Sequence, residues 1–202
     1  MNIHHSLTLI TIASLSVYLL GTAMKTQRTR DGFQNSHKVA VCMWYDDAIS
    51  EYADIARNIN QMYCDKHGFD LIFSNTRKSP DRHPAWEYMS LLRDVLHTRK
   101  YDYVMWIDAD ACFNFKSTYS IEAMIDENAN KDIIFSADDP ESGIPINTGV
   151  ILLKTTDYAI DFCNQIIDSE DIKECREKYN TPLWEQDCVN HLYTHNMNNI
   201  KE

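Results

Sequence analysis

The sequence lacks the short patterns that mark several common classes of protein. It contains no G-x-G-x-x-G segment and no G-x-x-x-x-G-K-[ST] segment, which argues against a Rossmann-type dinucleotide site and a Walker-type nucleotide site. None of its six cysteines forms a C-x-x-C pair, so we expect no structural zinc site. An even number of cysteines permits disulfides in an oxidising compartment, but several lie inside apolar runs, where a buried free thiol is the ordinary state.

Basic residues are also in the minority. The 202 residues include 19 Lys and Arg against 30 Asp and Glu, which gives a net charge of −11 at pH 7. Nucleic-acid-binding domains usually carry a basic surface, so we expect no nucleic-acid partner. The hydrophobic content of 44% is sufficient for the core of one domain with an appended segment.

The N-terminal part of the chain differs from the rest. Residues 7–23 carry no charge, but this stretch is short for a membrane span and is diluted by Ser and Thr. It predicts either the signal-anchor of a single-pass membrane protein or a signal peptide that is cleaved near the small residues at 21–23. By the positive-inside rule, the basic residues that follow would hold the rest of the chain in the cytosol. The expected parts are a membrane segment at 1–23, a polar stem at 24–37 and one domain at 38–202.

From residue 38 onward, apolar runs with strand character alternate with segments of helical periodicity. The expected strands are residues 39–43, 69–74, 101–107, 133–137 and 148–153. The expected helices are residues 49–67, 85–97, 118–128, 158–167 and 184–193. This alternation is typical of an α/β fold with a mostly parallel central sheet flanked by helices. In such sheets, ligands bind beyond the carboxyl ends of the strands.

Asp108 and Asp110 lie at such a strand end. They follow the run 101–107, whose aromatic and β-branched residues are typical of a buried strand. If the extended backbone continues, carboxylates two residues apart point to the same side, where they can hold a divalent metal through oxygen ligands. That metal can neutralise a diphosphate, which two bare carboxylates would repel. The pattern favours a nucleotide-diphosphate substrate, although acidic pairs at strand ends also occur as plain loop residues.

A second polar cluster, Asn147–Gly149, opens the expected strand at 148–153. Asn147 offers a side-chain donor and an acceptor, and Gly149 leaves room for a ligand to approach the backbone. A simple turn that enters a strand would give the same pattern.

A third cluster, Trp184–Asp187, begins an expected helix. Its polar groups can bond sugar hydroxyls while Trp184 covers an apolar sugar face, but an acidic first turn is also favoured by the helix dipole alone. Earlier in the chain, Trp86 belongs to an apolar helical stripe and is expected in the core. Arg93 on the same helix can either reach a phosphate or lie on the surface.

In this order, the segments resemble those of glycosyltransferase family 34, the galactosyl/mannosyl/xylosyltransferase group, which has a GT-A fold. The matching segments are Pro84-Ala85-Trp86 with Leu92-Arg93, Trp106-Ile107-Asp108-Ala109-Asp110-Ala111, Asn147-Thr148-Gly149-Val150 and Trp184-Glu185-Gln186-Asp187. The resemblance covers about Val39 to Tyr193. Glycosyltransferase family 8 has similar D-x-D and Gln-Asp segments, so it remains an alternative.

The resemblance implies a GT-A-like, nucleotide-sugar-binding domain. Such a domain would transfer a hexosyl or pentosyl unit from a UDP- or GDP-sugar to a glycan or glycoprotein acceptor, with retention of configuration and an α-linkage. It also implies a type II protein of the Golgi or secretory pathway, anchored by its N-terminal segment. This places the domain on the opposite side of the membrane from the one that the basic residues favour.

The same resemblance implies roles for individual residues. Asp108 and Asp110 would bind Mn²⁺, or Mg²⁺, on the donor diphosphate. The other implied donor-binding residues are Met43, Trp44, Tyr45, Arg93, Asn147, Thr148 and Gly149. The implied acceptor-binding residues are Trp184, Glu185 and Gln186, and the implied catalytic residues are Asn147, Gln186 and Asp187.

The chain departs from the family pattern at two points. Tyr88 stands where the family tends to have Lys, and the family's late histidine has no match before Glu202. These departures leave open a short variant, a fragment, or a membrane-tethered protein that binds nucleotide sugar or carbohydrate without turnover. A metal-dependent phosphohydrolase is less favoured, because some such enzymes use an aspartyl nucleophile near the first strand, whereas Asp108 follows a later one.

Overall fold

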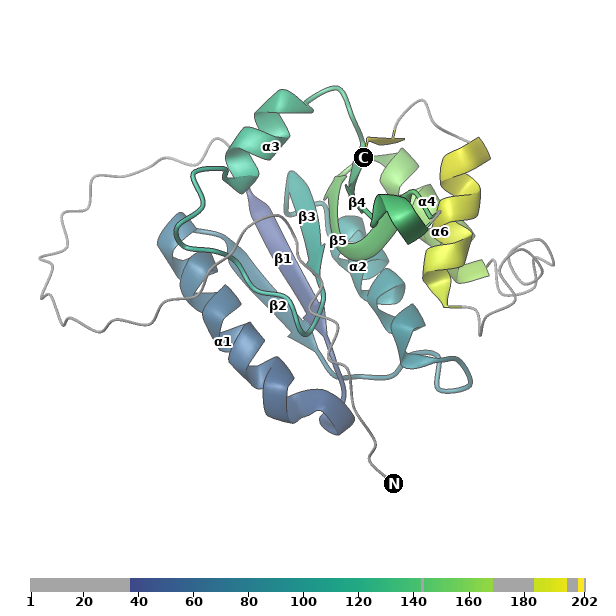
Figure 1. The fold of residues 1–202 in the computed structure, drawn as a ribbon, viewed down its shortest axis with the longest axis horizontal. Coiled ribbons are helices and arrows are strands. Elements are labelled where there is room, and N and C mark those ends of the chain that lie inside the picture. Colours follow the sequence, from purple (N-terminus) through teal and green to yellow (C-terminus); the bar gives the residue numbers. More distant parts are fainter. Residues whose placement is uncertain (1–36, 143, 169–183, 196–199, 202) are drawn as a thin grey trace, which may run out of the picture. The chain divides into compact units, whose positions relative to one another are not determined.

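The computed structural model describes residues 37–142, 144–168, 184–195 and 200–201 (Figure 1). The expected membrane segment at 1–23 and all but the last residue of the expected stem lie outside these ranges, so both stay predictions. Among the described helices, none combines the length and the apolar character that a membrane crossing requires.

The described strands form one six-stranded sheet in the order β2-β1-β3-β5-β4-β6 (Figure 1). Their bounds are β1 Val39–Trp44, β2 Asp70–Ser74, β3 Tyr103–Ile107, β4 Ile133–Ala137, β5 Ile146–Lys154 and β6 Ile200–Lys201. β1 is parallel to β2 and β3, and β4 is parallel to β6, whereas β5 is antiparallel to both β3 and β4. The mostly parallel sheet is therefore confirmed, with β5 as the one reversed strand among those described.

The described helices alternate with these strands as expected. Their bounds, with η for a 3-10 helix, are η1 Asp47–Ile49, α1 Ser50–His67, η2 Pro84–Trp86, α2 Glu87–His97, α3 Ile121–Glu127, η3 Pro140–Ser142, α4 Asp157–Asp168 and α6 Glu185–His195. α3 starts later than expected because Ser120 caps it. The Ser120 Oγ accepts a hydrogen bond from the Ala123 amide (3.2 Å), which satisfies one of the free N–H groups of the first turn.

Helices cover both faces of the sheet. Successive residues of a strand point to opposite faces, so Cys42 belongs to the core under α2, α4 and α6, while Val41 belongs to the core under α1 and α3. Trp86 is buried in the first of these cores, as predicted. The described cysteines are free thiols, and the buried ones are Cys42, Cys64, Cys163 and Cys188.

α1 buries a different face from the one that its large apolar residues mark. The exposed large residues of this helix are Tyr52, Ile55 and Met62. The buried face consists mainly of small residues together with Asn60, whose Nδ2 donates to the Ala111 carbonyl and whose Oδ1 accepts from the Phe113 amide, both at 3.0 Å. α1 therefore fixes the backbone that directly follows Asp108 and Asp110.

Candidate active site

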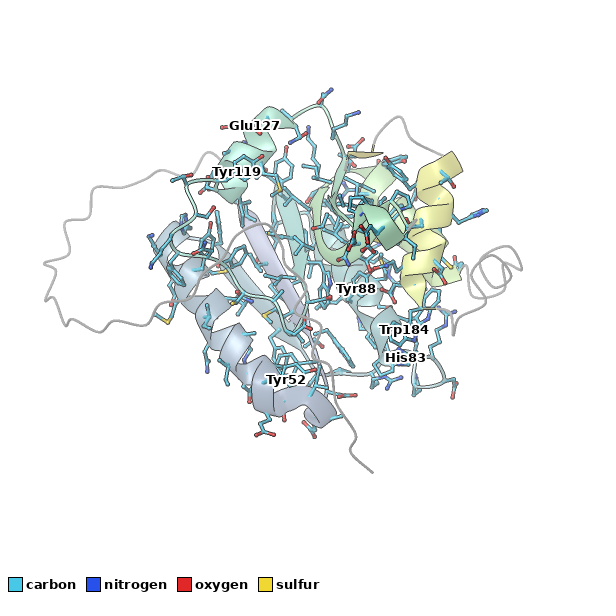
Figure 2. All side chains as sticks on the ribbon, viewed as in Figure 1. Tyr52, His83, Tyr88, Tyr119, Glu127 and Trp184 are labelled. Atoms are coloured by element: carbon cyan, nitrogen blue, oxygen red, sulfur yellow. The ribbon has the colours of Figure 1, made fainter. Side chains whose placement is uncertain are left out.

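A cavity of about 640 Å³ lies beside the carboxyl ends of β1 and β3, the edge where ligands bind in sheets of this kind. Its described lining contains four carboxylates and no Lys, Arg or His side chain. The lining residues are Trp44, Ile49, Tyr52, Pro84, Ala85, Tyr88, Trp106, Asp108, Ala109, Asp110, Ile144, Thr148, Trp184, Glu185, Gln186 and Asp187. Figure 2 labels three of them, Tyr52, Tyr88 and Trp184.

Asp108 is held at the point where β3 ends against β5. Its amide donates to the Gly149 carbonyl (2.8 Å), and its Oδ1 accepts from Trp106 Nε1 (3.0 Å). Burial raises the pKa of Asp108 from 3.8 to about 6; the hydrogen bond from Trp106 opposes this rise, and the negative charge of Asp110 adds to it. Asp110 is exposed, so the pair combines one fixed carboxylate with one that reaches into solvent.

Gly149 allows the Asp108 carboxylate to approach β5. A Cβ atom at Gly149 would lie 2.8 Å from Asp108 Oδ2 and 2.9 Å from Asn147 Oδ1. Asn147 Oδ1 also accepts a hydrogen bond from the Gly149 amide (2.8 Å). The close approach predicted at Gly149 is thus made by a carboxylate of the protein itself.

Thr148 ties β5 to the first turn of α6. Its amide donates to Gln186 Oε1 (3.1 Å), and its hydroxyl lies within hydrogen-bond distance of Gln186 Oε1 (3.1 Å) and Glu185 Oε1 (3.2 Å). Gln186 Nε2 donates to Asp138 Oδ2 (3.4 Å). The Gln186 amide therefore has a fixed orientation. Asp187, the next residue, lines the cavity, and burial raises its pKa.

Two buried oxygens at the cavity wall, Tyr88 Oη and Glu185 Oε2, have no hydrogen bond of good geometry with the described residues, although the Tyr88 hydroxyl lies close enough to Glu185 to oppose the rise of the Glu185 pKa. Burial raises the pKa of Glu185 from 4.5 to about 8, and the charge of Asp108 adds to this rise. Burial also raises the pKa of Tyr88 well above 10. An unpaired buried polar atom costs about 1–3 kcal/mol, so a ligand whose hydroxyls bond these atoms would recover that free energy.

The structure brings most of the predicted site residues to this cavity. Those that line it are Trp44, Asp108, Asp110, Thr148, Trp184, Glu185, Gln186 and Asp187. Asn147 and Gly149 lie at the Asp108 carboxylate but outside the lining. Their roles in binding or catalysis remain predictions.

Three predicted donor-binding residues lie elsewhere. Met43 is fully buried in the core under α1. The Tyr45 hydroxyl donates to Asp54 Oδ1 (2.5 Å), and Arg93 is paired with Asp94 (3.2 Å). None of the three lines the cavity, so their predicted role gains no support from the structure.

Two tyrosines line the cavity without having been placed there by sequence reasoning. Tyr52 lies in the expected helix at residues 49–67, where an aromatic residue is ordinarily part of the core, and Tyr88 is a departure from the family pattern. The Tyr88 ring stacks on Trp106 with centroids 4.6 Å apart, directly before the D-x-D segment. The signal for Tyr88 was its departure from the family pattern, in which Lys tends to stand two residues after the Trp.

The donor atoms at Asp108 and Asp110 fit a hard divalent cation, because such ions prefer carboxylate oxygens. In the described lining, no Lys, Arg or His side chain balances the charge of these two carboxylates. In the part of the chain that the structure describes, no group of three or more His, Cys, Asp or Glu side chains is arranged to hold a metal. The described protein ligands would therefore be these two residues, with other positions left to water and substrate.

No model of a known protein family matches the sequence, and no curated protein is significantly similar to it. Solved structures are similar. A glycosyltransferase involved in the glycosylation of the major capsid of PBCV-1 aligns over 81% of this chain and 80% of its own, with a TM-score of 0.67 and 16% identity. The fold is GT-A-like.

The glycosyltransferase GlyE of Streptococcus pneumoniae TIGR4 has the same fold, with a TM-score of 0.54 and 17% identity over 81% of this chain. The match covers 44% of GlyE, so the present chain spans less than half of that protein. These structural similarities establish the GT-A-like fold. At such low sequence identity they establish no particular activity. They give no specific support for family 34, which stays a prediction.

Proposed function

We propose that this protein is a glycosyltransferase that moves a hexosyl or pentosyl unit from a nucleotide-diphosphate sugar to a glycan acceptor, with a divalent metal and with retention of configuration. One observation carries the proposal. Asp108 and Asp110 line the same cavity as Thr148 and Gln186, in a fold shared with solved glycosyltransferases.

The charge of the cavity supports the metal requirement. Three of the four carboxyl groups of the cavity, those of Asp108, Asp110 and Asp187, stand without a cationic side chain in the described lining and would repel the negative diphosphate of a nucleotide sugar. Mn²⁺ or Mg²⁺ bound by Asp108 and Asp110 would supply Lewis-acid stabilisation of the leaving diphosphate. The chain's own contribution is to hold Asp108 in place through the Trp106 and Gly149 contacts.

The cavity lining contains two kinds of group, which suggests how the donor binds. Trp44, Ile49 and Tyr52 offer apolar and aromatic surface, suited to the flat face of a nucleobase. Thr148 and Glu185 offer polar groups with which hydroxyl groups of the donor sugar can form hydrogen bonds. The diphosphate would lie next to Asp108 and Asp110.

Retention by double displacement uses a group on the face of the sugar opposite the leaving diphosphate. Gln186 and Asp187 are the candidates. The Gln186 oxygen already accepts from Thr148, so it is suited to positioning, whereas the Asp187 carboxylate is the stronger nucleophile. In a double displacement, Asp187 would bond to the anomeric carbon as the nucleoside diphosphate leaves. The acceptor hydroxyl would then displace the Asp187 carboxylate and give its proton to the released diphosphate.

One observation favours a second candidate, a protein that binds nucleotide sugar or carbohydrate without turnover. Tyr88 lines the cavity at the position where the resembling family tends to have Lys, and the described lining contains no cationic side chain that could replace this Lys. A weaker hold on the leaving phosphate would reduce catalysis more than binding. In either case, the predicted N-terminal anchor would tether the domain to a membrane of the secretory pathway.

The test is release of nucleotide from a panel of UDP- and GDP-sugars by the full-length protein, with Mn²⁺ and with EDTA. We expect hydrolysis with at least one donor only when Mn²⁺ is present. Asp110→Asn should lower this rate about 100-fold or more, since a lost metal contact is worth several kcal/mol. The matched control is Asp65→Asn, an exposed Asp of α1 outside the cavity lining.

Calorimetry with the same panel separates the two candidates. Donor binding without release of nucleotide in any condition would support the binding protein and exclude the transferase. Full activity of Asp110→Asn would remove the proposed role of the carboxylate pair.

A further inference from the structure

Two aromatic rings stack at the rim of the cavity. The ring centroids of His83 and Trp184 lie 4.7 Å apart and the ring planes differ by 13° (Figure 2). Trp184 lines the cavity together with Pro84 and Ala85, which follow His83 in the chain. Trp184 is 50% exposed, whereas the other three tryptophans of the protein are buried. Trp184 is therefore the one tryptophan of the cavity lining whose indole is exposed to solvent.

The loop that carries His83 is held from the inside by Glu87. This carboxylate is only 2% exposed, and it accepts hydrogen bonds from the amides of Lys78 (2.7 Å) and Ser79 (2.9 Å) and from Arg77 Nε (3.0 Å). A buried carboxylate with this number of donors is well satisfied, so it fixes the course of the loop before His83.

Contacts on either side of His83 complete this arrangement. Arg77 Nη2 donates to the Arg82 carbonyl (2.5 Å), and the Arg82 guanidinium donates to the Ile167 carbonyl at the end of α4. His83 Nδ1 accepts from the Ala85 amide (3.3 Å) as the cap of η2. The loop thus fixes the position of the His83 imidazole, and the Trp184 indole stacks on this fixed ring.

We propose that the His83–Trp184 pair is the acceptor subsite, where the apolar face of a pyranose ring stacks on the exposed surface of the Trp184 indole. This inference rests on the proposed function. Aromatic rings provide a large flat apolar contact surface, and a preordered side chain loses less entropy on binding. His83 is a positioning residue, because it contacts the indole and acts on the sugar only through it.

The neighbours of Trp184 favour a carbohydrate over a purely apolar ligand. Glu185, Gln186 and Asp187 follow it directly and line the same cavity. Their oxygens and the Gln186 amide can bond the hydroxyl groups at the edge of a sugar ring. An apolar ligand would form no hydrogen bond with any of them.

Tryptophan fluorescence tests the subsite directly, because only one of the four tryptophans is exposed. The full-length protein is titrated with methyl pyranosides of glucose, galactose, mannose and xylose. We expect a saturable change in emission with at least one of them, and loss of that change in Trp184→Ala. The control is Tyr119→Ala, an exposed aromatic residue outside the cavity lining. No saturable change up to ~0.1 M glycoside, or a change retained in Trp184→Ala, would overturn the subsite; at that concentration even a millimolar Kd would saturate.

A second pair of variants tests the positioning role. His83→Ala should weaken the apparent glycoside affinity about five-fold, the change expected when one ring–ring contact is lost. His83→Phe keeps the ring and should restore most of the affinity, although it removes the cap of η2. Equal affinities for wild type and His83→Ala would overturn the role of His83, as would an equal loss in both variants.

Donor hydrolysis by the unmodified protein distinguishes failure of the subsite from failure of the proposed function. Glycoside binding at Trp184 without hydrolysis of any donor would keep the carbohydrate subsite and exclude the transferase. Hydrolysis without any response at Trp184 would keep the transferase and overturn the subsite.

Discussion

At the scale of single residues, the strictest requirement in the site is at Gly149. Gly149→Ala would place a Cβ 2.8 Å from Asp108 Oδ2, and overpacking of this kind costs about 1–3 kcal/mol. We expect the variant to lose stability and also to lose most Mn²⁺-dependent donor hydrolysis, because the displaced carboxylate is a proposed metal ligand. Chemical denaturation and the hydrolysis assay measure the two effects.

Gly68→Ala is the matched control for this variant. Gly68 ends α1 with φ 71°, a conformation in which Ala costs about 1 kcal/mol or more, and it lies outside the cavity lining. This control should lose stability while its hydrolysis in the folded state stays normal. Equal losses of hydrolysis in both variants would show that Gly149 acts through stability alone.

Glu185 makes stability depend on pH in a predictable direction. Its pKa is about 8 in the folded protein against an ordinary value of 4.5, so the folded state holds a proton that the unfolded state has released. The free energy of unfolding should therefore fall as pH rises, by up to about 1.4 kcal/mol per pH unit for one proton, and the effect ends above pH 8. Asp108, whose raised pKa is about 6, contributes little to the pH dependence of stability between pH 6 and 8.

Glu185→Gln removes this proton. Measured by denaturation in EDTA from pH 6 to 8, the variant should show a flatter dependence than wild type. The difference between the two proteins isolates Glu185, because all other ionisable groups are the same in both. Parallel curves would contradict a protonated Glu185.

Sequence reasoning found the residues of the site whose polar groups stand out in apolar surroundings, such as Asp108, Asp110 and Gln186. It did not place Tyr52 and Tyr88. An aromatic residue in a helical period is ordinarily part of the core, and the period does not say which turn of the helix borders a cavity. Met43 and Tyr45 show the opposite limit. They flank Trp44, which lines the cavity, but successive residues of an extended chain point to opposite faces, so neither of them reaches the cavity.

At the scale of elements, the connection between α1 and the D-x-D segment depends on Asn60. Asn60→Ala removes the hydrogen bonds to Ala111 and Phe113 and leaves two backbone groups without their side-chain partner. We expect a loss of about 2–3 kcal/mol of stability and weaker Mn²⁺ binding, since the backbone after Asp110 is no longer held. Denaturation and Mn²⁺ titration by calorimetry measure these effects.

Asn58→Ala provides the comparison, because Asn58 is exposed on the same helix. Asn58→Ala changes helix propensity in the same way as Asn60→Ala but removes no contact to the loop. The stability of the Asn58→Ala variant should therefore not fall. An Asn60→Ala protein that binds Mn²⁺ as wild type does would show that the D-x-D segment holds its shape without α1.

The existence and order of the helices followed from periodicity, whereas the buried face of α1 did not. Tyr52, Ile55 and Met62 recur at helical spacing, which predicts a buried stripe, yet these three residues are exposed and Ala53 and Ala56 are buried. Close packing of a helix on a sheet needs small side chains at the contact, and a hydrogen-bonding Asn can replace an apolar residue where loop backbone must be satisfied. Which face of a helix is buried therefore depends on the residues it packs against, and these cannot be read from the local sequence pattern.

At the scale of the whole molecule, the α/β class and the mostly parallel sheet were predictable, but the reversal of β5 was not. Orientation is decided by connections and by pairing across the sheet, where β5 lies between β3 and β4. This reversal brings the beginning of β5, with Asn147 and Thr148, to the edge where β1 and β3 end. The polar segments that the sequence shows far apart meet for this reason.

The net charge of −11 and the carboxylates of Asp108, Asp110 and Asp187 in the cavity lead to a prediction about how ligands bind. UDP alone should bind weakly, because its diphosphate enters a negative site. Mn²⁺ alone should bind modestly, because the described protein ligands are two. Together, each should strengthen the binding of the other, and the reciprocity of linked equilibria requires the same factor in both directions.

Calorimetry of UDP with and without Mn²⁺, and of Mn²⁺ with and without UDP, measures this factor. A thermal-shift assay should show that the pair stabilises the protein by more than the sum of the two single shifts, since ligand at 100 times its Kd adds about 2.7 kcal/mol. The coupling should vanish in Asp110→Asn and persist in Asp65→Asn. UDP that binds equally well in EDTA would contradict the argument, because a cavity with this charge would then hold a diphosphate without a cation.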